Sequence, residues 1–152
     1  MEHFHAPVGG IRLHCVADGA PEAPLMLFVH GFPEFWYCWK QQLAEFGRDY
    51  RAVAFDLRGH GNSGHPWQAE AYDHAAPWGE DVARVIGALG LKKPLIVGWS
   101  FGGNVAMDFA ATQPQVPVAG YLLVGTAAGT TAVPAPPPAP ASALPRPTAS
   151  PD

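Results

Sequence analysis

The sequence predicts an α/β fold built on a mostly parallel, doubly wound sheet. Short apolar, β-branched runs alternate with longer amphipathic stretches from residue 25 to residue 124, the order that right-handed crossovers between parallel strands produce. The later runs are apolar almost throughout, as strands covered on both faces are. With 152 residues, 48% of them hydrophobic, the chain suffices for one domain with its own core.

Six segments have the length and composition of strands. The first is an N-terminal edge strand, and the last three are nearly continuous apolar runs. In chain order they are residues 4–8, 11–17, 25–29, 50–55, 95–97 and 121–124.

Three stretches between the strands carry apolar side chains at the spacing of an amphipathic helix. Pro77 suits the first turn of the second helix, Gly90 suits its end, and Pro114 suits the end of the third. The apolar positions are Trp36, Trp39, Leu43 and Phe46, then Val82, Val85, Ile86 and Leu89, then Phe101, Val105 and Phe109.

Composition and charge exclude several classes of function. The net charge of −4 comes from 9 basic and 13 acidic residues with no basic block, so neither nucleic acid nor a membrane is expected as a partner. Cys15 and Cys38 form neither a disulfide framework nor a metal-knuckle spacing. The start of the chain lacks the pattern of a signal peptide, so we expect a cytoplasmic protein and leave its oligomeric state open.

The stretch "GWSFGG" places Ser100 in a G-x-S-x-G motif between an apolar strand and an amphipathic helix. This context is typical of a nucleophile elbow, in which a sharp turn exposes the serine oxygen. Gly98 and Gly102 leave room for neighbouring backbone, and the N–H of Phe101 at the helix start is a candidate oxyanion donor. The alternative is a small serine in a tight turn.

The segment "HGFPEFWYCW" follows the strand at residues 25–29. The backbone N–H of Phe32 is the candidate second oxyanion donor, in a loop whose geometry Gly31 and Pro33 set. His30 is interpreted as an imidazole that shapes this loop, with a catalytic base as the alternative. Candidates for the wall of an apolar acyl pocket are Phe32, Phe35 and Trp36.

The segment "FDLRGHGNSG" follows the strand at residues 50–55. We expect Asp56 and Arg58 to pair and hold this loop, and we interpret Asp56 as structural rather than as a catalytic acid. His60 and His65 are expected to be solvated. No metal site is expected, because a shared strand face explains the spacing of His3, His5 and His14 as well as a metal pair does.

Together, "HGFPE", "DLRGHGNSG" and "GWSFGGNVAMDFA" resemble the α/β-hydrolase superfamily over roughly residues 10–126. The resemblance is to the branch that includes epoxide hydrolases, haloalkane dehalogenases, esterases and C–C bond hydrolases. It implies a serine, acid and histidine triad, two backbone oxyanion donors, a small-molecule substrate and no cofactor. It also implies a helical cap after the sixth strand.

Two differences from members of this branch narrow the reaction class that the resemblance implies. In epoxide hydrolases and dehalogenases an aspartate stands at the position of Ser100, whereas serine forms an acyl intermediate with esters, thioesters, amides or activated C–C substrates. Dehalogenases have a tryptophan that holds the halide where this chain has Phe101, which cannot donate that hydrogen bond. An epoxide-hydrolase-like activity remains the alternative.

The triad partners that follow the serine in the family have no counterpart in this chain. After Ser100 the carboxylates are Asp108 and Asp152, and no histidine follows, so no triad acid and no triad histidine are assigned. We therefore predict the N-terminal half of a serine hydrolase at residues 1–126, without the cap and last strands and catalytically incompetent or nearly so by itself.

The remaining residues, 127–152, form a Pro/Ala-rich tail that is expected to be disordered, because it has too little apolar surface to offset the entropy of ordering. A truncated or shifted reading frame explains the abrupt change of composition, with a genuine linker as the alternative. A different class of function is also open, a non-enzymatic binding module whose "PAPPPAP" segment is the ligand of an aromatic groove.

Overall fold

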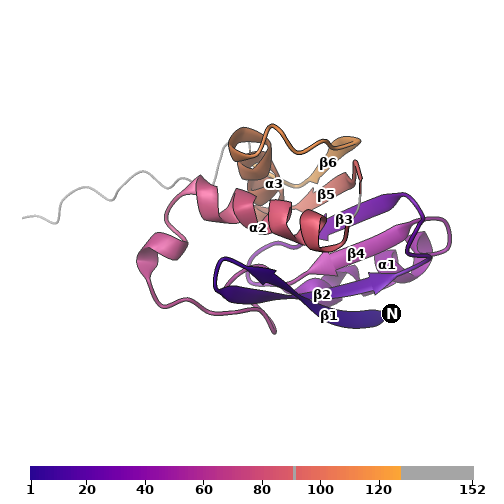
Figure 1. The fold of residues 1–152 in the computed structure, drawn as a ribbon, viewed down its shortest axis with the longest axis horizontal. Coiled ribbons are helices and arrows are strands. Elements are labelled where there is room, and N and C mark those ends of the chain that lie inside the picture. Colours follow the sequence, from indigo (N-terminus) through magenta and orange to yellow (C-terminus); the bar gives the residue numbers. More distant parts are fainter. Residues whose placement is uncertain (91, 128–152) are drawn as a thin grey trace, which may run out of the picture.

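A six-stranded sheet with helices on both faces forms the frame of the protein (Figure 1). The computed structural model describes residues 1–90 and 92–127, so the predicted tail lies outside the described residues from position 128 onward. The strands are β1 (Glu2–Val8), β2 (Ile11–Asp18), β3 (Leu25–Val29), β4 (Arg51–Phe55), β5 (Leu95–Trp99) and β6 (Gly120–Val124).

The strand order, β1-β2-β4-β3-β5-β6, confirms the predicted fold class. Strands β4, β3, β5 and β6 run parallel, while β1 and β2 form an antiparallel hairpin whose second strand pairs with β4. Val29 of β3 lies opposite Phe55 of β4 on one side and Gly98 of β5 on the other. The three loops that follow these strands therefore leave the sheet at the same edge.

The helices cover the two faces of the sheet unequally (Figure 1). Helix α1 (Lys40–Phe46) lies on one face, and α2 (Ala75–Ala88) and α3 (Phe101–Thr112) lie on the other. The first predicted helix is a 3-10 turn, η1 (Trp36–Trp39), that leads into α1, and a second turn, η2 (Ala69–Ala71), precedes α2. Among the described residues, no helix is long and apolar enough to cross a membrane.

The alternation of side chains along the strands divides the core into two layers. On β3, Leu27 and Val29 face the cluster beneath α2 and α3, whereas Met26 and Phe28 face the cluster beneath α1. Because both faces of β3 are covered, all five of its residues are buried and its sequence is apolar throughout.

Strand β6 is the outer strand at one side of the sheet. The side chains on its two faces remain exposed to 40–51%: Tyr121, Leu122, Leu123 and Val124. Beside it, on the α1 face, lies an apolar groove of about 470 Å³ lined by Phe28, Trp39, Val97, Trp99, Leu122 and Val124 among others.

Two glycines of α2 provide a matched test of the packing between α2 and α3. A Cβ atom at Gly79 would overlap the hydroxyl of Thr112 and lie 3.0 Å from the carbonyl oxygen of Asp108, whereas a Cβ at Gly87 would meet nothing within 4 Å. We expect Gly79→Ala to lower the free energy of unfolding by about 1–3 kcal/mol. Gly87→Ala should raise it by about 0.5 kcal/mol, because alanine restricts the unfolded chain.

Urea unfolding followed by circular dichroism measures both changes. Equal effects of the two substitutions would contradict the close approach of α3 to α2 at Gly79.

Candidate active site

Ser100 occupies the sharp turn between β5 and α3. Its backbone is left-handed, with φ 53° and ψ −121°, a conformation that costs a non-glycine residue about 1–3 kcal/mol. Its N–H donates to the carbonyl oxygen of Val124 (2.9 Å), and its own carbonyl oxygen accepts from the N–H of Gly103 (3.0 Å) and the hydroxyl of Thr126 (3.1 Å). These three hydrogen bonds hold the strained turn in place.

The glycines around the turn allow it to lie close to neighbouring backbone. A Cβ at Gly98 would lie 2.7 Å from both the carbonyl oxygen of Gly102 and the Cα of Gly103, and a Cβ at Gly102 would overlap the carbonyl groups of Val29 and His30. Helix α3 therefore begins directly against the end of β3.

The loop that follows β3 lies against Ser100. A Cβ at Gly31 would be 3.1 Å from the Cβ of Ser100 and 3.2 Å from the carbonyl oxygen of Trp99. The next peptide bond, Phe32–Pro33, is cis, and the Phe32 side chain is 71% exposed. Among the described residues, no acceptor is bonded to the N–H of Phe32, and none of them is hydrogen-bonded to the hydroxyl of Ser100.

His30 is fully buried beneath this loop, and both of its ring nitrogens are engaged. Nδ1 donates to the carbonyl oxygen of Gly31 (2.8 Å), which leaves Nε2 to accept the N–H of Leu57 (2.9 Å). Burial lowers the pKa of His30 to about 4, so the ring is neutral near pH 7. An imidazole bonded in this way holds the β3 loop to the β4 loop and has no nitrogen to offer Ser100.

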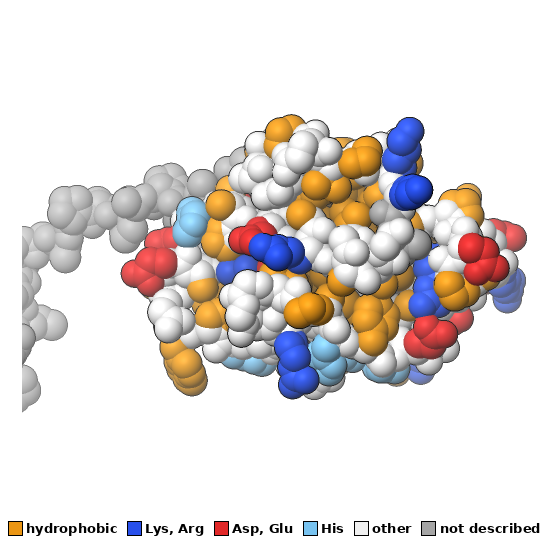
Figure 2. Space-filling model, in the orientation of Figure 1, with side chains coloured by type: hydrophobic (Ala, Val, Ile, Leu, Met, Phe, Trp, Pro, Cys, Tyr) orange, Lys and Arg blue, Asp and Glu red, His pale blue; other side chains and the backbone are white. Residues whose placement is uncertain are grey.

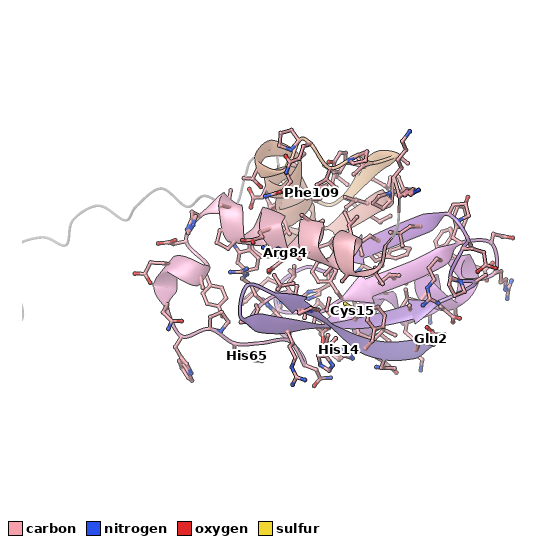
Figure 3. The ribbon with its side chains drawn as sticks, viewed as in Figure 1. Glu2, His14, Cys15, His65, Arg84 and Phe109 are labelled. Carbon is pink, nitrogen blue, oxygen red and sulfur yellow. The ribbon has the colours of Figure 1, made fainter. Side chains whose placement is uncertain are left out.

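The carboxylate of Asp56 is fully buried and joins three segments of the chain. It accepts hydrogen bonds from the ring of His14 on β2 (2.8 Å), from the N–H of Trp36 (2.7 Å) and from the N–H of Asn62 (2.9 Å). Figure 3 shows His14 on β2 beside the first strand. These donors lie on β2 and in the segments that follow β3 and β4. The contacts of Asp56 are therefore those of a residue that holds loops in position.

The expected pair between Asp56 and Arg58 is wrong. Arg58 instead forms a bidentate ion pair with Asp81 of α2, at 2.7 Å for each hydrogen bond, and also donates to the carbonyl oxygens of Ala71 and Pro77. The chain turns away from the sheet after β4, so Arg58 points to α2 while Asp56 stays beside β2. Burial raises the pKa of Asp81, and the guanidinium of Arg58 opposes part of that rise.

A cavity of about 550 Å³ opens beside the elbow. Phe32 and Phe101, whose amides are the candidate oxyanion donors, both line it. The other lining residues come from the segment between β4 and α2 and from α2 itself: Arg58, Gly59, His60, His65, Pro66, Trp67, Tyr72 and Trp78. Figure 3 shows His65 on this long connecting segment.

The lining corrects three sequence-based expectations. Phe35 stacks on Tyr37 (ring centroids 5.9 Å apart) and Trp36 packs on His3 (5.1 Å), so within the described residues neither belongs to the cavity. His60 is not a solvated side chain, because it is half-buried and its ring contacts those of His30 and Phe32. Sequence reasoning missed Trp67, Tyr72 and Trp78, and the one usable signal was the recurrence of aromatic residues every five or six positions before and into α2.

The three N-terminal histidines do share one face of the β1–β2 hairpin. His3 Nδ1 lies 3.1 Å from His14 Nε2, and the ring of His5 lies 5.4 Å from that of His14. In the described part of the chain, no group of three or more histidine, cysteine or carboxylate side chains has the arrangement of a metal site.

Comparison with known proteins gives one family. A family model described as "Alpha/beta hydrolase family" matches residues 26–152. Epoxide hydrolase 4 of Mus musculus is 43% identical over 107 residues, which make up 70% of this chain and 30% of that protein. Epoxide hydrolase 1 of Caenorhabditis elegans is 44% identical over 106 residues, or 70% of this chain and 26% of that protein.

Solved structures show the same likeness. A putative aryl esterase from Burkholderia cenocepacia has a TM-score of 0.79 at 32% identity, covering 83% of this chain and 47% of that one. The epoxide hydrolase VrEH1 from Vigna radiata has a TM-score of 0.74 at 34% identity, covering 80% and 39%. The chain thus spans less than half the length of these relatives.

The buried state of His30 gives a pH-dependent stability. Well above pH 6.5 His30 is neutral in both the folded and the unfolded protein. As the pH falls from there towards 4, the unfolded chain takes up a proton that the folded protein does not. Stability is therefore lost across that window, by up to about 3 kcal/mol from this residue. His30→Gln, which cannot titrate, should show a smaller fall.

Urea unfolding at a series of pH values compares the two proteins. Parallel pH profiles for wild type and His30→Gln would mean that the buried imidazole is protonated as readily in the folded protein as in the unfolded chain.

Proposed function

Because the chain belongs to the α/β-hydrolase family, we propose that Ser100 is the nucleophile of a hydrolytic site for acyl compounds such as esters. The observation that carries the proposal is the left-handed backbone of Ser100 at the turn between β5 and α3, with Gly31 of the β3 loop against it. Solved relatives named as esterases support the acyl chemistry.

The proposed reaction begins with addition of the Ser100 oxygen to the substrate carbonyl. The carbonyl electron pair moves onto its oxygen, and the N–H groups of Phe32 and Phe101 stabilise the resulting charge, together with the positive end of the 12-residue helix α3. The leaving group then departs as an alcohol and an acyl-serine remains, which water hydrolyses. In enzymes of this kind one such donor contributes about 10²- to 10³-fold to the rate.

The proton of the Ser100 hydroxyl needs a base. All seven histidines precede Ser100 in the chain, the last being His74, and His30 is engaged at both nitrogens. Without an adjacent base, a serine hydroxyl has only its ordinary, weak nucleophilicity. We therefore propose that these 152 residues supply the nucleophile and the oxyanion donors, and that acylation by them alone is slow.

Epoxide opening is the second candidate, favoured by the names of the curated relatives. The chemistry of Ser100 opposes it. A serine oxygen that attacks an epoxide carbon forms an ether, which water does not cleave near neutral pH. A carboxylate that attacks the same carbon forms an ester, which water can hydrolyse. Ser100 thus supports turnover of acyl substrates.

We also propose a small-molecule substrate rather than a nucleic acid or a membrane. On the face shown in Figure 2, acidic and basic side chains are scattered and not gathered by sign, which offers no track for phosphates. A cytoplasmic location remains a prediction from the sequence.

Added imidazole tests both the assignment of Ser100 as the nucleophile and the inference that acylation by these residues alone is slow. An alkyl fluorophosphonate should phosphonylate Ser100 slowly, with loss of fluoride, and free imidazole should speed the reaction at least tenfold, a fraction of the roughly 10²- to 10⁴-fold effect of a positioned base. Mass spectrometry of peptides locates the adduct. Ser63, buried and hydrogen-bonded to the backbone of Asp56, is an internal control that should stay unmodified, and Ser100→Ala should remove the adduct.

Two results would count against the proposal. Fast labelling of Ser100 in the absence of imidazole would show that the chain already holds a base. No labelling of Ser100 at any imidazole concentration would remove its assignment as the nucleophile.

A further inference from the structure

The cavity beside the elbow is walled by aromatic rings in edge-on arrangements. Trp78 and Phe101 meet at 87° with ring centroids 5.2 Å apart, and Phe32 meets the His60 ring at 90° and 5.7 Å. Trp78 also contacts Tyr72 at 5.9 Å. Such an array presents both ring faces and ring edges, which are the two partners that a further aromatic ring prefers.

Three polar groups of this wall bind carbonyl oxygens of the protein itself. The hydroxyl of Tyr72 donates to the carbonyl oxygen of Pro66 (2.9 Å), and the indole N–H of Trp78 donates to the carbonyl oxygen of Tyr72 (3.2 Å). His60 Nδ1 donates to the carbonyl oxygen of Arg58 (3.0 Å). The surface that the cavity presents to a ligand is mainly carbon.

Arg58 is the only lysine or arginine among the described residues of the wall, and its charge is already paired. Each nitrogen of the Arg58 guanidinium has a protein acceptor: Nε and Nη2 bind the carboxylate of Asp81, and Nη1 binds the carbonyl oxygen of Ala71. The side chain of Arg58 is 9% exposed and that of Asp81 is fully buried. The cavity therefore offers no unpaired arginine charge to attract an anion.

From these three observations we propose that the cavity binds a neutral aromatic ring of the substrate and selects it over a saturated ring of the same size. The proposal rests on the proposed function only for the chemistry that follows binding. Phe32 and Trp67 form the accessible part of this aryl site, since their side chains are 71% and 96% exposed. A bound ring would bury part of both.

Two ketones that cannot be hydrolysed test the selectivity without any turnover. Acetophenone and cyclohexyl methyl ketone have the same carbon skeleton and differ in the aromaticity of the ring. We expect acetophenone to bind the full chain about fivefold to tenfold more tightly, as expected for one or two aromatic contacts. Ligand-observed NMR titration measures both dissociation constants.

Exposed positions supply the variants, because substitution of the buried Trp78 endangers folding. Phe32→Leu combined with Trp67→Leu keeps apolar side chains but removes two rings, and should reduce the preference to below about threefold. Tyr37→Leu, at an exposed ring outside the cavity, should leave the preference unchanged.

Equal affinity for the two ketones would overturn the aryl site, and so would an undiminished preference in the double variant. If Ser100 is not labelled but the ketone selectivity is retained, the proposed nucleophile is refuted and the aryl site stands. If Ser100 is labelled as expected but the two ketones bind equally, the aryl site alone is refuted.

Discussion

The buried carboxylate of Asp56 is the constraint around which the loops of the candidate site are arranged. A charge with no exposure to water is tolerated only if donors surround it, and here the donors come from β2, from the segment after the β3 loop and from the β4 loop. Gly61, with φ 50°, passes so close to this carboxylate that a Cβ atom would overlap it. Three segments distant in sequence are thus fixed by one side chain.

A second link connects this arrangement to Ser100, the candidate nucleophile. His30 joins the β3 loop to the β4 loop through Leu57, and Gly31 sets the same loop against Ser100. The candidate oxyanion donor Phe32 is therefore positioned by buried groups of the loops on either side of it. Donors held in advance of the reaction need no reorganisation when charge develops, which is the main source of their effect.

The features predicted from sequence were those encoded locally. The G-x-S-x-G motif, the apolar runs and the helix-ending Gly90 each involve neighbours in the chain, and the structure has the predicted strands and helices. The ion pair of Arg58 with Asp81 spans 23 positions, and the hydrogen bond of His14 to Asp56 spans 42. Such pairs depend on strand register and on the path of an irregular connection. The sequence of that connection has no helical or strand periodicity from which its path could be predicted. The aromatic wall around Trp67 and Tyr72 was missed for the same reason.

The hydrogen bonds that hold Ser100 also connect it to the outermost strand. The N–H of Ser100 is bound by Val124, and its carbonyl oxygen is bound by Thr126, just beyond the end of β6. Among the described strands β6 has one neighbour, and its side chains are 40–51% exposed, which are features of segments that open locally at low free energy. When β6 frays, the left-handed turn loses the hydrogen bonds from Val124 and Thr126 and keeps only the one from Gly103. The conformation of the Ser100 turn thus depends on the pairing of an outer strand as well as on the packing of the core.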